Sequence, residues 1–327
     1  MNGLKSMTIG FGGAEAEVLN FGASIADLRI PVEGSRRSVV LSLADRANYP
    51  RHGAYFGSIA GRCANRIGGG RATISGREYR LSLNEKGKTH LHGGFNGFSS
   101  RYWNFESTGN DRVRLSLTSP DGEEGYPGTM QASCEYRFLS EGVLRIELAA
   151  TVDAPSIANF ATHSYFNLGR EPHILNHELE IPAFGYTPVD GDLIPTGELA
   201  DVGGTGFDFR EFRRIAANRP LTPTGFDINY AAYPKRAEEL RALARLRSPE
   251  GDLSLAIWST EPGLQFYDGQ YLPLPVEIMD GRNVRFGGCC LEPQCYPDAV
   301  NHRQFPGVAL LPGERYLQRT EYRFSAG

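Results

Sequence analysis

Short runs of alternating polar and apolar residues, each ended by Gly, Ser, Asn or Asp, fill most of this chain. Residues 71–74 and 77–81 flank a Ser-Gly turn, and residues 132–138 and 143–148 flank another turn. This is the pattern of β-hairpins, because successive side chains of a strand point to opposite faces. The 39 glycines and 20 prolines supply the turns that many hairpins need. The sequence therefore predicts an all-β protein.

One segment conflicts with this pattern in its composition. Residues 236–247 are rich in strong helix formers. Apolar residues nevertheless stand at every second position from 240 to 246, and residues 248–252 have the composition of a turn. We therefore predict a strand in the second half of the segment. Many strands with few helices must bury their apolar faces against another sheet, which predicts a large antiparallel β-sandwich.

The composition is that of a soluble globular protein. Forty per cent of the residues are hydrophobic, 22% are charged, and the formal net charge is -4. No linker or repeat divides the sequence, so we expect residues 1–327 to form a single domain. The charge gives no basic footprint for nucleic acid, and no apolar stretch is long enough for a membrane span. With a single early lysine and no apolar run at the N-terminus, we expect a cytoplasmic protein with small neutral partners.

The five cysteines are expected to be reduced. An odd number in a long chain without a signal peptide argues against a disulfide framework. No C-x-x-C pair occurs, and the adjacent Cys289 and Cys290 would point to opposite faces of a strand, where they cannot easily share a metal. We interpret all five as packing residues.

Two distant segments supply groups that can transfer protons. The first contains His163, and the second contains Glu292. A histidine can give or take a proton near neutral pH, and a carboxylate can take one. Burial on a strand would raise the pKa of Glu292 toward the range of a general base. The alternatives are a glutamate paired with a structural arginine and a histidine satisfied within the core.

The histidines do not predict a metal site. His90 and His92 have the spacing that places two imidazoles on one face of a strand, but no third ligand lies nearby in sequence. His173 and His177 have helical spacing, but Pro172 and the strand-like residues that follow argue against a helix. The chain also has no Walker-type loop and no G-x-G-x-x-G that opens a helix. We therefore expect no metal and no cofactor.

Several sequence blocks together resemble the aldose 1-epimerases, also called galactose mutarotases. The blocks keep the order of that family and run from about residue 10 to the C-terminus. They are Gly61–Ile67, Leu91–Gly94, His163–Leu168, Glu261–Tyr267, Leu291–Gln294 with Pro297–Ala299 and Asn301, and Leu311–Tyr316.

The resemblance implies a galactose mutarotase-like supersandwich with a monosaccharide in an open cleft on one sheet. It implies that Glu292 removes the proton of the C1 hydroxyl while His163 protonates the ring oxygen O5. The ring then opens, the C1–C2 bond rotates, and the ring closes on its other face. The substrate-binding residues that the resemblance implies are Asn65, Arg66, His92, Tyr165, Asp227 and Gln265.

The residues themselves leave alternatives open. Arg66 and Asp227 would also suit a structural salt bridge, and Gln265 an exposed strand position. Phe266 and Tyr267 are expected to pack on the apolar face of the sugar ring. Isoleucine follows Asp227 where many family members have a polar residue, which leaves the preferred sugar open. The sequence also leaves the oligomeric state open.

Two other functions compete with the mutarotase hypothesis. One is a non-catalytic sugar-binding module, and the other is a glycosidase with two carboxylates, for which Asp298 and Asp227 are available.

Overall fold

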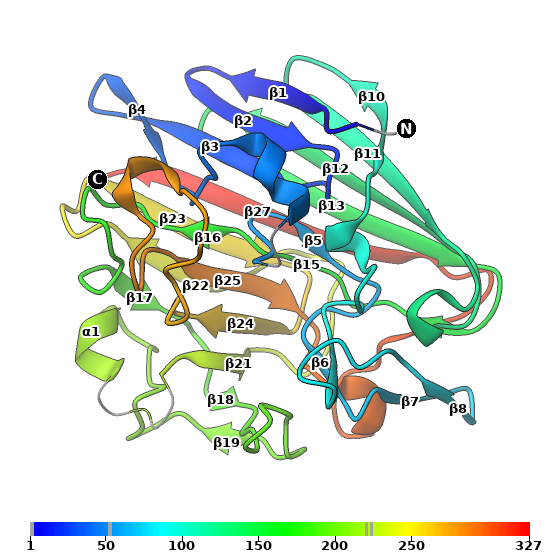
Figure 1. The fold of residues 1–327 in the computed structure, drawn as a ribbon. Coiled ribbons are helices and arrows are strands. Elements are labelled where there is room, and N and C mark those ends of the chain that lie inside the picture. Colours follow the sequence, from blue (N-terminus) through cyan, green and yellow to red (C-terminus); the bar gives the residue numbers. More distant parts are fainter. Residues whose placement is uncertain (1–2, 52–53, 220–221, 223–224) are drawn as a thin grey trace.

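The computed structural model describes residues 3–51, 54–219, 222 and 225–327. Its largest element is a nine-stranded antiparallel sheet that crosses the whole molecule (Figure 1). In spatial order its strands are β10 (Asn104–Thr108), β11 (Arg112–Ser119), β12 (Met130–Ser140), β13 (Val143–Val152), β27 (Tyr316–Ala326), β23 (Leu253–Ser259), β22 (Arg241–Arg247), β17 (Glu178–Glu180) and β20 (Arg213–Arg214).

A six-stranded antiparallel sheet lies in front of the lower half of the large sheet in Figure 1. Its strands are β16 (Tyr165–Phe166), β25 (Cys289–Gln294), β24 (Gly263–Tyr267), β21 (Asp227–Ala231), β18 (Gly185–Tyr186) and β19 (Ala200–Asp201). A four-stranded sheet at the top of the view consists of β1 (Ser6–Phe11), β2 (Ala14–Leu19), β3 (Ile25–Val32) and β4 (Ser35–Ser38). The predicted all-β antiparallel sandwich is confirmed.

The sheets meet in one continuous hydrophobic core. On β12, Met130, Ala132, Cys134, Tyr136 and Phe138 are buried, while the residues between them are more exposed. This alternation places one face of the strand in the core, as the sequence pattern predicts. The same core includes side chains from β1 at one end of the chain to β27 at the other. The burial of this shared face is the main stabilising contribution to the sandwich.

Both predicted hairpins are confirmed. Strand β7 (Arg71–Ile74) pairs with β8 (Arg77–Arg80), and β12 pairs with β13. The helix-forming segment is a strand over Arg241–Arg247, but its alternation is interrupted by an irregular register between Ala242 and Ala244. Leu243 and Ala244 are therefore both buried. Such a bulge shifts the side chains that follow by one position, which regular alternation cannot predict.

Short ladders and single helical turns complete the fold. The ladders are β5 (Ile59–Ala60) with β15 (Ala161–Thr162), β6 (Arg66–Gly68) with β9 (Thr89–Leu91), and β14 (Ser156–Ile157) with β26 (Ala309–Leu310). The helical turns are α1 (Ile215–Asn218) and the 3-10 turns η1 (Arg46–Arg51), η2 (Phe98–Ser100), η3 (Glu123–Gly125), η5 (Met279–Gly281) and η6 (Ala299–Asn301). None of the helices in the described part of the chain has the length and apolar character needed to cross a membrane.

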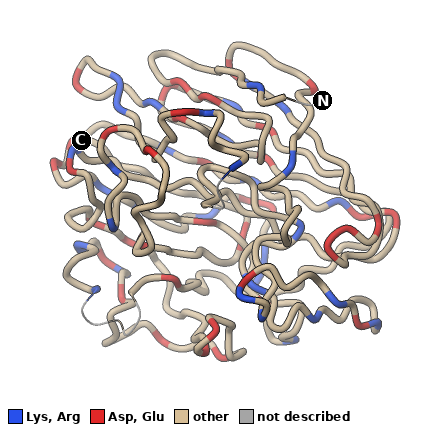
Figure 2. The backbone as a smooth tube through the Cα atoms, viewed as in Figure 1, with Lys and Arg blue, Asp and Glu red and all other residues tan. Residues whose placement is uncertain are grey.

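Charged residues of both signs are interspersed over the whole molecule (Figure 2). Some charged residues are buried, and Arg62 is one of them. The guanidinium of Arg62 donates to the backbone carbonyls of Ser119, Pro120, Pro127 and Gly128 at 2.8–3.0 Å. A cation in this position fixes the chain just before β6, which carries Arg66 into the cleft described next.

Candidate active site

The register of the six-stranded sheet places several predicted residues on one face. Gln265 on β24 lies opposite Glu292 on β25, and Asp227 on β21 lies opposite Tyr267 on β24. Because side chains alternate along a strand, Phe266 must point the other way, and it is fully buried in the core. The expectation that Phe266 packs on the sugar is therefore wrong.

The other predicted residues lie on loops and short strand ladders beside this face. His163 lies between β15 and β16, where its backbone N–H donates to Ser58 and its carbonyl accepts from Gly57, both at 2.9 Å. Across the cleft, the backbone N–H of His92 donates to the Asn65 carbonyl at 3.0 Å. Asn65 and His92 have φ values of 60° and 49°, in the left-handed region that non-glycine residues rarely adopt. Such backbone strain is typical of functional sites.

These elements enclose a cleft of about 260 Å³. This volume lies a little under the ~300–1,000 Å³ of sites for drug-sized ligands and suits a smaller one. All eight residues predicted from the sequence line it: Asn65, Arg66, His92, His163, Tyr165, Asp227, Gln265 and Glu292. The other lining residues are Ala54, Tyr55, Glu85, Leu91, Tyr267, Tyr271, Leu272 and Leu274, of which the sequence suggested only Tyr267 as a sugar contact.

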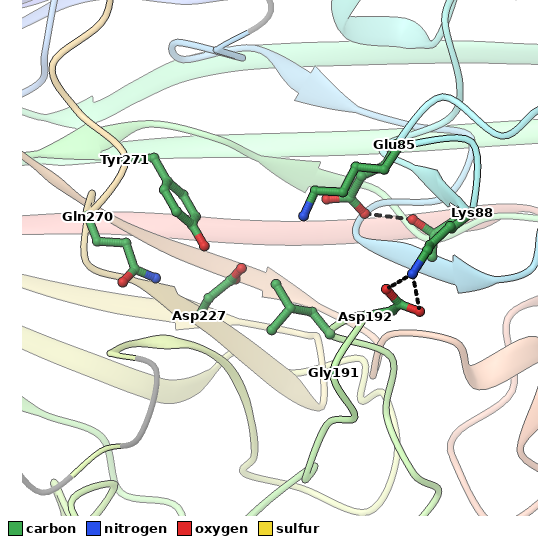
Figure 3. A pocket seen from close by; sticks show the side chains of 10 residues that line it. Glu85, Lys88, Gly191, Asp192, Asp227, Gln270 and Tyr271 are labelled. Carbon is green, nitrogen blue, oxygen red and sulfur yellow. Dashed lines mark hydrogen bonds and ion pairs between the residues drawn. The ribbon is translucent and has the colours of Figure 1, made fainter.

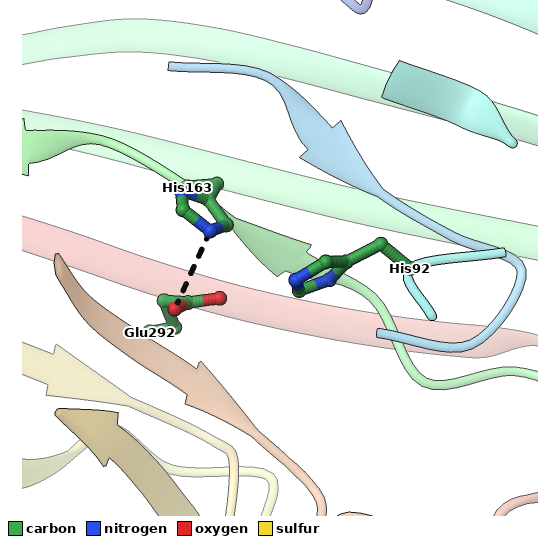
Figure 4. Close-up of side chains that lie close together, drawn as sticks. All are labelled: His92, His163 and Glu292. Atoms are coloured by element: carbon green, nitrogen blue, oxygen red, sulfur yellow. Dashed lines mark ion pairs between the residues drawn. The ribbon is translucent and has the colours of Figure 1, made fainter. Parts of the chain in front are cut away.

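Glu292 and His163 face each other at the floor of this cleft (Figure 4). Glu292 Oε1 lies 3.8 Å from His163 Nε2, and the two side chains are only 3% and 6% exposed. That separation is too long for a direct hydrogen bond. Glu292 Oε2 is buried and has no hydrogen-bond partner among the described residues. The Glu292 carboxylate and the Nε2 of His163 can therefore bond to a ligand.

Burial changes the acidity of both groups. It raises the pKa of Glu292 well above the usual range, and the charge of Asp227 adds to this effect while Arg66 opposes it. Burial lowers the pKa of His163 to about 4, against a raising effect from its own backbone carbonyl. Above the lowered pKa of His163 and below the raised pKa of Glu292, the pair holds a single proton, which resides on Glu292. Transfer of that proton to His163 gives a carboxylate beside an imidazolium.

His92 is fixed as a hydrogen-bond donor to the cleft. Its Nδ1 accepts the backbone N–H of Asn65 at 3.1 Å. Burial, followed by the charges of His163 and Arg66, lowers the pKa of His92 well below its usual value, so the ring is neutral. A neutral imidazole that accepts at Nδ1 carries its hydrogen on Nε2. His90, in contrast, contacts Tyr126 and Ser82, so the two histidines do not act as a pair.

His92, His163 and Glu292 together have the donor atoms of a metal site. One potential ligand atom from each lies within 4.8 Å of the others. A ligating histidine, however, normally donates its second ring N–H to an acceptor. The second nitrogen of His92 is instead occupied by a donor, the Asn65 N–H. His92 could bind a metal only by losing this bond, so the set fits a metal poorly.

We therefore expect chelation to leave activity unchanged. Prolonged dialysis against EDTA should not alter the catalytic rate of the protein. His92 does not complete a set of metal ligands, so we expect no catalytic step to depend on a metal ion. Addition of zinc to the dialysed protein is the control. A loss of rate in EDTA that zinc restores would contradict this expectation.

A polar network at the other end of the cleft orients Arg66 and Asp227. The Arg66 guanidinium donates twice to Glu85 at 2.8 Å, and its third nitrogen lies 3.5 Å from Asp227. Burial would lower the pKa of Arg66, but the Glu85 hydrogen bonds and the Asp227 charge outweigh it and raise that pKa. Gln265 donates to Asp227 at 2.7 Å and is only 3% exposed, so the exposed position considered for it is wrong. The Arg66–Asp227 salt bridge exists, but within the cleft.

A second pocket of about 180 Å³ adjoins the cleft and shares Glu85, Asp227 and Tyr271 with it (Figure 3). An ion pair between Lys88 and Asp192, with nitrogen and oxygen 2.8 Å apart, lies among the residues that line this second pocket.

Comparison with known proteins identifies the family. The family model of aldose 1-epimerase matches residues 5–323. The galactose mutarotase of Rattus norvegicus is 38% identical over 314 residues, which are 94% of this chain and 90% of that protein. The aldose 1-epimerase of Escherichia coli (strain K12) is 35% identical over 323 residues, 96% of this chain and 93% of that protein. The chain belongs to the aldose 1-epimerase family.

A solved structure agrees with this assignment. An aldose epimerase homologue from C. elegans superimposes with a TM-score of 0.90 at 27% identity, covering 98% of this chain and 99% of that one. Its fold confirms the galactose mutarotase-like architecture. Like the named relatives, this member of the aldose 1-epimerase family is an enzyme. The relatives support mutarotase activity, which is the interconversion of the α and β anomers of a free aldose.

The two competing functions are not favoured for this aldose 1-epimerase family member. Asp298, one of the two carboxylates considered for a glycosidase, is bonded to the Gly68 N–H and to Asn301, at 3.1 and 2.6 Å. It also lies 3.3 Å from His302. The carboxylate of Asp298 is thus engaged by other groups, and Asp298 is not among the residues that line the cleft.

All five cysteines are buried and free. All five belong to hydrophobic clusters, in keeping with packing. The thiol of Cys290 also contacts His163, which the sequence alone did not indicate.

Proposed function

We propose that this chain is a mutarotase in which Glu292 and His163 act as the acid–base pair. The observation that carries the proposal is the buried approach of Glu292 Oε1 to His163 Nε2 at 3.8 Å, with neither group bonded to the other. A sugar with its C1 hydroxyl and O5 between them would contact both. Glu292 as a carboxylate takes the proton of the C1 hydroxyl while His163 gives one to O5.

The pKa directions support this division of roles. The ring oxygen is a weak base that gains proton affinity only as the C1–O5 bond breaks, so it requires a strong acid nearby. Burial lowers the pKa of His163 to about 4, which makes its protonated form such an acid. Burial raises the pKa of Glu292, which makes its carboxylate a stronger base than an exposed one. Ring closure reverses both transfers, so the pair is regenerated without a cofactor.

The remaining lining residues are proposed to hold the monosaccharide. Arg66 and Asp227 form a donor and an acceptor in the cleft, and Asp227 and Glu292 are separated by two strand spacings of about 4.8 Å each. Gln265 lies between them, with its Oε1 buried and unpartnered among the described residues. Asn65, His92 and Tyr165 complete the set, with His92 as a donor.

The isoleucine that follows Asp227 has no part in this binding. Ile228 lies opposite Phe266 in the register and is buried in the core, on the other face of β21. Its difference from the polar residue of many family members therefore does not bear on the choice of sugar. We further propose that residues 1–327 form one domain, which the shared core supports, and that the protein is cytoplasmic with a free monosaccharide as its partner.

Polarimetry tests the proposed function. Freshly dissolved α-galactose and α-glucose should reach anomeric equilibrium faster with the protein than in buffer, at a rate proportional to protein concentration. Binding of these sugars without acceleration would support a sugar-binding module instead. Release of the aglycone from an aryl galactoside would support a glycosidase.

A further inference from the structure

Side chains of a single strand, β25, lie next to both nitrogens of the His163 ring. Cys290 Sγ lies 3.5 Å from Nδ1, and Glu292 Oε1 lies 3.8 Å from Nε2. Cys290 and Glu292 are two residues apart on β25 and therefore lie on the same face of that strand. Glu292 lines the cleft, whereas Cys290 is fully buried beneath it. The imidazole thus has one nitrogen toward the reacting groups and one toward the thiol.

The position of the ring hydrogen decides what this histidine can do. A neutral imidazole carries one N–H, on either Nδ1 or Nε2. If the hydrogen is on Nδ1, the lone pair of Nε2 faces Glu292 and can receive its proton. If it is on Nε2, the lone pair faces Cys290, and a proton accepted there cannot reach the sugar. Only the first tautomer therefore serves the proposed chemistry.

The contact with Cys290 fits a hydrogen on Nδ1. The sulfur of Cys290 is a weak acceptor within reach of that nitrogen, although a thiol can also donate to Nδ1 when the ring hydrogen lies on Nε2. Burial and the charge of Glu292 raise the pKa of Cys290 well above its usual value, so the sulfur remains a neutral thiol.

We propose that Cys290 is a positioning residue that keeps the hydrogen of neutral His163 on Nδ1 and leaves Nε2 free toward Glu292 and the substrate. The inference rests on the proposed function, because it concerns how His163 becomes the acid of that reaction. Cys290 is not among the residues that line the cleft, so it acts through His163.

The proton balance follows from this arrangement. The proton of neutral Glu292 moves to Nε2 of His163, which leaves a carboxylate and an imidazolium. The carboxylate takes the proton of the C1 hydroxyl, and Nε2 gives its proton to O5 as the C1–O5 bond breaks. His163 is then again neutral with its hydrogen on Nδ1, and Glu292 is again neutral. A thiol suits this role, because a stronger acceptor would stabilise the imidazolium and weaken it as an acid.

The surroundings of His163 leave few other groups to set its tautomer. Among the residues that the structure describes, the charged or titratable side chains that face the ring are Tyr55, His92, Tyr165, Cys290 and Glu292. The three aromatic partners contact the ring through its faces and edges, with centroids 5.1–5.5 Å away. His92 carries the opposite tautomer, because the Asn65 N–H occupies its Nδ1. The two neighbouring imidazoles thus present one acceptor and one donor to the cleft.

Nitrogen NMR of protein labelled with ¹⁵N-histidine tests the proposal directly. In the unliganded wild type at neutral pH, the His163 signals should be those of the Nδ1–H tautomer, with assignment from a His163→Asn variant. Cys290→Ala should give a mixture of tautomers and lower kcat by about 10- to 100-fold, the scale of a misplaced catalytic group. In Cys290→Ser the hydroxyl should preserve the tautomer and restore much of kcat, while its stronger acceptor raises the pKa of His163.

Cys289→Ala is the matched control. Cys289 is equally buried on the same strand but faces the hydrophobic core, so its loss should lower stability and leave both tautomer and kcat unchanged. An Nε2–H tautomer in the wild type would overturn the proposal, as would a Cys290→Ala variant that matches Cys289→Ala in tautomer and kcat. The NMR measurement needs no substrate, so this inference and the mutarotase function can fail separately.

Discussion

Glu292→Gln is expected to lower kcat by about 10²- to 10⁴-fold while the sugar still binds. Positioned proton transfer is worth about this factor, and an amide cannot take the proton of the C1 hydroxyl. Glutamine keeps the shape of the side chain, so the cleft and its contacts should persist. The kcat is measured by polarimetry with a fresh anomer, and sugar binding by calorimetry.

Stability separates this variant from an ordinary buried substitution. Folding raises the pKa of Glu292, so the unfolded chain releases this proton at a lower pH than the folded protein does. As the pH rises above the pKa of Glu292 in the unfolded chain, this group therefore destabilises the folded state increasingly. Glu292→Gln removes this contribution and should not lower the melting temperature at neutral pH. Glu261→Gln is a suitable control, because Glu261 is equally buried but bonded to Arg236, at 2.6 Å. It should lose stability and keep its kcat.

Near-normal turnover in folded Glu292→Gln would show that the carboxylate has no part in the chemistry. Glu292 would then be an unpaired buried group without a function, and the proposed reaction would need another base.

The fold could be predicted because its signals are local. Alternation along a strand and the composition of a turn act within a few residues, and they predicted both hairpins and the strand within the helix-forming segment. The bulge near Leu243 could not be predicted, since it depends on the neighbouring strand β23. Which strands pair across the two sheets likewise depends on contacts between distant residues.

The site was predicted through the resemblance more than through physical pattern. The eight residues come from segments more than 200 positions apart, and neither composition nor periodicity brings His92 near Glu292. Glu85 was missed because its role depends on Arg66, which it meets only in the folded chain. Phe266 was misplaced although strand alternation from Gln265 was sufficient to exclude it from the cleft face.

The contact between Cys290 and His163 shows the same limit more sharply. The adjacent cysteines were correctly expected to face opposite sides of a strand, and both were interpreted as packing residues. The sequence does not say what each side meets. Cys289 meets the hydrophobic core and Cys290 meets the proposed acid, a distinction that only the three-dimensional structure provides.

The second large effect is expected to be non-additive. His163→Asn alone should also lower kcat by about 10²- to 10⁴-fold, because asparagine cannot protonate O5. The Glu292→Gln/His163→Asn double variant should be little slower than the worse single variant. Each proton transfer requires the other, so removal of the second partner from a disabled pair costs much less than its removal from an intact one. Rates that multiply across the two variants would contradict a shared relay.

The pH dependence of kcat/KM checks the same relay in the intact protein. The active form has one proton on the pair, so activity should fall at low pH, where the pair gains a second proton as His163 titrates near its lowered pKa of about 4. It should fall again at high pH, as Glu292 loses its proton above its raised pKa. The two limbs report apparent values of the pair. Glu292→Gln should lose the alkaline limb, because the group that titrates there is gone, whereas the Glu261→Gln control should keep both limbs.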